Sequence, residues 1–72
     1  MEDKQKICDL LLVTLQATRE YSDLESLTYV TPKQPHRYDS YVEAGFTSGG
    51  KRIINTSMDS GYAMIRDIID HI

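Results

Sequence analysis

Cations and tyrosines are interleaved in the middle of the sequence, a pattern that suits the binding of single-stranded nucleic acid. Between residues 30 and 52, four lysines and arginines stand against two acids. In such platforms, bases stack on aromatic side chains and cations contact the phosphates. The structural alternative is that tyrosines are common in strands and that lysines protect sheet edges. The candidate binding residues are Arg37, Tyr38, Tyr41, Lys51 and Arg52.

The two ends of the chain carry the opposite charge. Residues 1 to 26 hold six acids against three bases, and residues 57 to 72 hold three acids against one base. Because carboxylates imitate phosphates electrostatically, an acidic protein can compete with nucleic acid for a basic groove on another protein. The alternative is that these acids only solvate helices. The candidate partner-binding acids are Asp9, Glu20, Asp23, Glu25, Asp67 and Asp70.

Nucleophilic and phosphate-loop chemistry are not indicated. Cys8, the single cysteine, lies on an apolar helical face and is expected to be a core residue. The two histidines, His36 and His71, have no serine or cysteine at motif spacing. Residues 45–51 have the spacing of a phosphate-binding loop, but an arginine replaces the magnesium-binding hydroxyl and a strand is expected to follow.

One metal-dependent alternative is left open. Asp39 and Glu43 flank the expected hairpin near Lys51 and could hold a divalent cation for phosphodiester cleavage, as in a DNA nickase. The preferred interpretation has no catalytic residues, no cofactor and no bound metal. The net charge of −3 also argues against a dedicated reader of duplex DNA.

Two helices are expected to frame the sheet that positions these residues. The first runs from Asp3 to about Tyr21, and its apolar residues cover more than one stripe, which suggests that part of it packs on a partner or a second copy. The last helix is expected to be capped by Ser57 or Asp59 and to run to the chain end.

Three strands are expected between the helices. Leu24 to Thr31 is rich in strand-favouring residues, and the proline-containing segment from Thr31 to Arg37 is a loop. Tyr38 to Phe46 alternates apolar and polar residues, and a Thr-Ser-Gly-Gly turn joins it to Lys51–Asn55. The sequence therefore predicts one α+β domain over residues 1–72, an αβββα order with both helices on one face of an antiparallel sheet.

Length and composition limit the class of protein. A chain of 72 residues buries only about 60% of the surface that its unfolded form exposes, and one cysteine excludes an internal disulfide. Self-association is therefore expected to add stability. The apolar stretch from Leu10 to Thr18 is too short for a membrane span, and no signal-peptide pattern precedes it, which predicts a cytoplasmic protein without membrane contact.

The C-terminal half carries a family resemblance. The stretches EAGFTSGGKRIIN (43–55) and DSGYAMIRDII (59–69) resemble small uncharacterised proteins of phages and mobile elements in gut Firmicutes. That group includes anti-CRISPR inhibitors, and some of these resemble a curved-sheet-plus-helix fold related to single-strand-binding transcriptional coactivators. This chain departs from that fold by beginning with a helix and by having three strands instead of four. The resemblance implies binding, not catalysis.

These observations predict a phage or mobile-element accessory protein that binds and inhibits a host defence nuclease of the CRISPR type. The alternative is a homo-oligomeric module that binds single-stranded nucleic acid. Both hypotheses place function in surfaces instead of in a catalytic centre.

Overall fold

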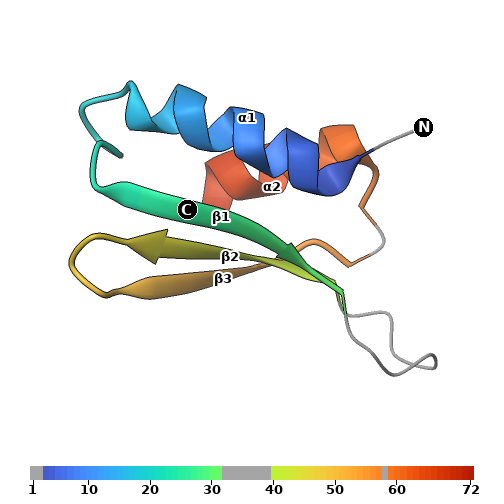
Figure 1. Ribbon diagram of the computed structural model, residues 1–72. Helices are drawn as coiled ribbons and strands as arrows, with labels where there is room; N and C mark the ends of the chain where they lie inside the picture. Colours follow the sequence, from blue (N-terminus) through green and yellow to red (C-terminus); the bar gives the residue numbers. More distant parts are fainter. Residues whose placement is uncertain (1–2, 32–39, 58) are drawn as a thin grey trace.

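The computed structural model describes residues 3–31, 40–57 and 59–72 as two helices on one face of a three-stranded sheet. The elements are α1 (Lys4–Gln16), β1 (Leu24–Val30), β2 (Tyr41–Phe46), β3 (Lys51–Asn55) and α2 (Gly61–His71). The strands are antiparallel and lie in the order β1-β2-β3. Figure 1 shows α1 along β1, with α2 on the same side of the sheet. The predicted αβββα fold is confirmed.

The first helix ends earlier than the sequence predicted. Asp3 caps its start by accepting a hydrogen bond from the Lys6 amide at 3.0 Å, but the helix stops at Gln16, before Tyr21. The Thr18 hydroxyl donates to the Leu15 carbonyl at 2.6 Å and accepts from the Tyr21 amide. These hydrogen bonds of the Thr18 hydroxyl take the place of backbone bonds that a further helical turn would make, so the helix ends here.

The cap of α2 also differs from the prediction. Ser60, and neither Ser57 nor Asp59, caps the helix by accepting from the Ala63 amide at 3.2 Å. The Ser57 amide instead donates to the Asn55 side chain, and the Asp59 amide donates to the Thr56 carbonyl. Turns therefore occupy the residues that precede Ser60. The helix runs to His71, close to the predicted end.

The hairpin between β2 and β3 is confirmed. Gly49 has a φ of 93°, a conformation that glycine adopts without steric cost, and the Phe46 amide donates to the Gly50 carbonyl at 2.9 Å. The predicted start of the second strand at Tyr38 and Asp39 lies outside the described residues, as does the predicted loop from residue 32 to Arg37. Neither described helix is long and apolar enough to cross a membrane.

The core lies between the sheet and the helices. All five elements supply it, and its buried apolar residues are Cys8, Leu24, Leu27, Val42, Ala44, Ile54, Met64, Ile68 and Ile72. Cys8 is fully buried, as predicted, and burial together with the Asp9 charge raises the pKa of its thiol to about 11. Truncating the larger of these side chains to alanine costs about 2–5 kcal/mol.

The broad apolar face of α1 is divided between core and surface. Ile7, Leu11, Leu12 and Leu15 pack against the core. Leu10 and Val13 remain 62% and 66% exposed. The sheet and α2 therefore cover most of the face, and two residues are left on the outer side of the helix.

Candidate binding surface

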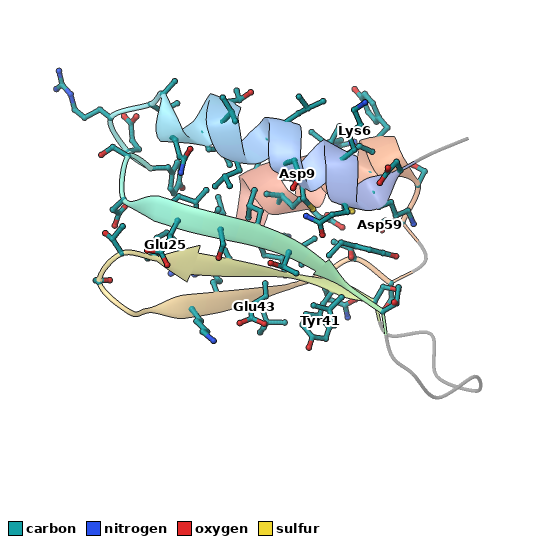
Figure 2. The ribbon with its side chains drawn as sticks, in the orientation of Figure 1. Lys6, Asp9, Glu25, Tyr41, Glu43 and Asp59 are labelled. Atoms are coloured by element: carbon teal, nitrogen blue, oxygen red, sulfur yellow. The ribbon has the colours of Figure 1, made fainter. Side chains whose placement is uncertain are left out.

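Within residues 3–31, 40–57 and 59–72, both helices lie on one face of the sheet and no helix or strand covers the opposite face. Strand alternation and register place one set of side chains there, and Figure 2 shows Tyr41 and Glu43 pointing away from the helices. We call this set the open sheet face; it comprises Ser26, Thr28, Val30, Tyr41, Glu43, Gly45, Lys51, Ile53 and Asn55. It contains two apolar side chains, an aromatic ring and an ion pair, a mixture typical of surfaces that bind other proteins.

Charge on the open sheet face is balanced. Lys51 Nζ lies 3.2 Å from Glu43 Oε1, and the lysine is the more exposed of the two. An exposed pair of this kind contributes about 0–1 kcal/mol to stability. Its larger effect is on recognition, because it neutralises the single cation of this face instead of leaving it free to contact a phosphate.

The structure separates the five predicted nucleic-acid residues. Tyr41 and Lys51 share the open sheet face, but Arg52 points to the helix side, where its Nη1 donates to the Ile72 backbone oxygen at 2.6 Å. Arg37 and Tyr38 lie outside the described residues. Adjacent residues of a strand face opposite ways, so the sequence already held the signal that separates Lys51 from Arg52.

Three of the six predicted acids gather at one end of the molecule. Glu20 and Asp23 are exposed in the turn that joins α1 to β1, and Glu25 is exposed at the start of β1; we call these three residues the acidic end. The Thr47 amide donates to the Asp23 carbonyl at 2.9 Å, which ties this turn to the β2–β3 hairpin. The backbone of the acidic end is therefore fixed.

The other predicted acids lie elsewhere. Asp9 is on the exposed side of α1 and accepts from Gln5 Nε2 at 2.9 Å. Asp67 and Asp70 lie on α2. The six acids therefore do not form a single row of negative charge.

A pair of carboxyl groups joins α2 to the segment before it, which sequence analysis missed. Interaction with the Asp67 side chain raises the pKa of Asp59 above its usual value; burial and the charge of Asp67 act in the same direction, and Lys4 opposes them. Lys4 Nζ donates to the Asp59 backbone oxygen at 2.7 Å and lies 5.6 Å from the centre of the Tyr29 ring. Lys4 thus links α1 both to β1 and to the segment that precedes α2.

Glutamine side chains of α1 hydrogen-bond to backbone groups along the outer edge of β1, a second feature that sequence analysis missed. The Gln5 side chain accepts from the Tyr29 amide at 2.9 Å and donates to the Leu27 carbonyl at 3.2 Å. Gln16 donates to the Leu24 carbonyl at 2.9 Å. The helix therefore supplies hydrogen bonds that a neighbouring strand would otherwise make.

The described residues offer little to a metal ion. No group of three or more histidine, cysteine or acidic side chains gathers within residues 3–31, 40–57 and 59–72. Glu43, one of the two predicted cation ligands, is paired with Lys51, and Asp39 lies outside the described residues.

Comparisons with known proteins do not extend this description. No family model, no curated protein and no solved structure matches the chain. The resemblance of the C-terminal half to phage and mobile-element proteins therefore stays a prediction.

Proposed function

We propose that this protein acts by binding another protein, as a phage or mobile-element accessory protein that inhibits a host defence nuclease of the CRISPR type in the host cytoplasm. The observation that carries the proposal is the acidic end. Two of its three exposed carboxylates lie in the turn between α1 and β1, the third lies at the start of β1, and the backbone of this turn is tied to the β2–β3 hairpin. A nuclease holds its nucleic acid in a positively charged channel, and such a channel attracts this arrangement.

The clustering of acids in the acidic end favours binding through charge over binding through a deep pocket. Glu20, Asp23 and Glu25 lie within six residues of one another, and Arg19 is the only cation in the same turn. Exposed carboxylates accelerate encounter with a basic surface, and they lose this effect as salt screens the charges. Inhibition should therefore weaken as ionic strength rises.

The test is a cleavage assay with an RNA-guided nuclease from a strain that hosts the element. The triple variant Glu20→Gln, Asp23→Asn and Glu25→Gln removes the charges and leaves the turn intact, because the bond at residue 23 uses its backbone oxygen. We expect the variant to need roughly tenfold more protein for half-inhibition, and to show a weaker salt dependence.

The control is the double variant Asp9→Asn and Asp70→Asn, which removes two exposed acids from the helices, against three from the acidic end, so inhibition is compared per charge removed. It should inhibit nearly as well as the wild type. Failure of the wild-type protein to protect target DNA would overturn the proposed function. Equal loss in the two variants would show that net charge, and not the acidic end, is responsible.

Binding of single-stranded nucleic acid is the second candidate, because Tyr41 and Lys51 share the open sheet face. Base stacking on an aromatic side chain is worth about 1–3 kcal/mol per base. Tyr41→Ala should therefore weaken binding in a fluorescence-anisotropy titration with labelled single strands, whereas Tyr62→Ala on the exposed side of α2 should not. Absence of wild-type binding at low salt would exclude this function.

A further inference from the structure

The two edges of the sheet differ in how their backbone groups are satisfied. On the β1 edge, Gln5 and Gln16 of α1 bond to the outward amide of Tyr29 and to the outward carbonyls of Leu24 and Leu27. β3 forms the other edge, and in the described part of the chain no strand lies beyond it. Among the described residues, one edge is therefore covered and the other is open.

The hydrogen-bond pattern identifies which residues of β3 face outward. The Phe46 amide donates to the Gly50 carbonyl, and the Thr56 amide donates to the Ser40 carbonyl, so these even-numbered residues turn their backbone groups toward β2. Backbone groups alternate along a strand. The amides and carbonyls of Lys51, Ile53 and Asn55 therefore point away from the sheet.

β3 lacks the features that usually block the pairing of an edge. Residues 51–55 contain no proline, and the register with β2 is continuous, whereas β1 carries the irregularity between Leu24 and Ser26. Lysine is an edge-protecting residue, but Lys51 is drawn onto Glu43. At the centre of the strand, Ile53 is 59% exposed. An edge with continuous register and an exposed β-branched residue at its middle is suited to strand addition.

We propose that a second copy of this chain pairs with β3, antiparallel and centred on Ile53, to form one continuous sheet across a twofold axis. The charges of the strand select this arrangement. Centring on Ile53 places Lys51 opposite Asn55 and Arg52 opposite Ile54 of the second copy, so no like charges meet. Parallel pairing in register would instead place Lys51 beside Lys51 and Arg52 beside Arg52 of the second copy, which is unfavourable because like charges repel. In this register, the second copy pairs with β3 over residues 51–55 without bringing like charges together.

The proposal is independent of the proposed function, because it uses β3 and not the acidic end. It also differs from dimerisation through the helices, which the exposed Leu10 and Val13 of α1 would mediate. An isologous interface repeats the same residue at the axis, so a charge placed at position 53 meets its own copy. A charge on α1 would not affect pairing at β3.

The test compares the dimer dissociation constants of the wild type, Ile53→Lys, Ile53→Thr and the double variant Leu10→Lys and Val13→Lys by sedimentation equilibrium. Position 53 is exposed and lies opposite Glu43, so lysine is compatible with the folded monomer. We expect Ile53→Lys to raise the dissociation constant about tenfold or more, Ile53→Thr to have a smaller effect, and the α1 variant to have none.

Amide hydrogen exchange supplies a direct readout of the edge. In the wild type, the amides of Lys51, Ile53 and Asn55 should become slower to exchange as protein concentration rises. In Ile53→Lys, they should stay fast, while the β2-directed amides of Arg52 and Ile54 stay protected and report that the sheet is intact. A wild type that is monomeric at every concentration, or a dimer disrupted by the α1 variant and not by Ile53→Lys, would overturn the proposal.

Discussion

Replacing Gly45 by alanine should destabilise the wild-type protein, but the same replacement should stabilise a variant in which Ser26 is already alanine. The two residues are paired across β1 and β2, and a Cβ added at position 45 would lie 2.6 Å from Ser26 Oγ. The next nearest atom, Ser26 Cβ, is 3.9 Å away, which is an ordinary contact. The steric conflict at Gly45 is therefore with a single oxygen atom.

Two opposing effects determine how much Gly45→Ala changes the free energy of unfolding. Overpacking costs about 1–3 kcal/mol, and rotation of the serine hydroxyl relieves part of it. The lower entropy of the unfolded chain when glycine becomes alanine stabilises by about 0.4–1 kcal/mol, because the φ of Gly45 is not positive. Gly45→Ala should therefore destabilise the wild type by about 1 kcal/mol, which is roughly 4–8 °C in Tm. In Ser26→Ala, the same change should stabilise by about 0.5 kcal/mol.

The assay is urea unfolding of the wild type, both single variants and the double variant at one protein concentration. The expected coupling energy between positions 26 and 45 is about 1.5 kcal/mol. Gly50→Ala is the matched control: a Cβ there would lie at an ordinary 3.7 Å from Ser48 Oγ, so only the entropic effect remains, and this variant should stabilise by about 0.5 kcal/mol whether or not Ser26 is replaced. Additive effects of the two single changes, within about 0.3 kcal/mol, would refute the steric argument.

Three further predictions concern the contacts that join the helices to the sheet. The pKa of Asp59 is raised in the folded state, so the stabilisation that its protonated form provides is complete below the unfolded pKa and is lost as pH rises through the folded pKa. Asp59→Asn removes the charged form, and it should therefore stabilise the protein at pH 7 more than at pH 4, as measured by urea unfolding. Gln5→Ala leaves the Tyr29 amide and the Leu27 carbonyl without their partner and should destabilise by about 1–3 kcal/mol, with faster exchange of the Tyr29 amide; unchanged exchange would contradict the edge contact. Cys8, fully buried and with a pKa of about 11, should react with a thiol reagent only as fast as the chain unfolds, and rapid labelling of the native protein would be inconsistent with its burial.

The order of elements could be predicted because it depends on local patterns. The alternation around Val42 and Ala44, the glycines of the hairpin and the apolar stripe of α2 each act within a few residues. The end of α1 was missed because the Thr18 hydroxyl competes with the helix, and the α2 cap was missed because several hydroxyl and acidic residues stand near one another. Propensity does not distinguish among such neighbours.

The contacts between elements could not be predicted from pattern. Gln5 and Tyr29 are 24 residues apart, and Lys4 and Asp59 are 55 apart. Their pairing follows from how α1 docks on the sheet, which no single segment specifies. Of the candidate sites, the sequence grouped Tyr41, Lys51 and Arg52, and the structure places Tyr41 and Lys51 on one face of the sheet, whereas strand alternation turns Arg52 to the opposite face.

The glutamines that cover the β1 edge have a consequence for how many copies can associate. A sheet with one available edge forms a closed pair, because each copy has nothing further to offer once that edge is used. A sheet with two available edges adds copies without limit and forms fibres. Gln5 and Gln16 of α1 occupy the edge of β1, so the pairing proposed above would use the one edge that β3 leaves available in each copy. Under that proposal, the first helix limits the assembly to two copies and prevents growth into a fibre.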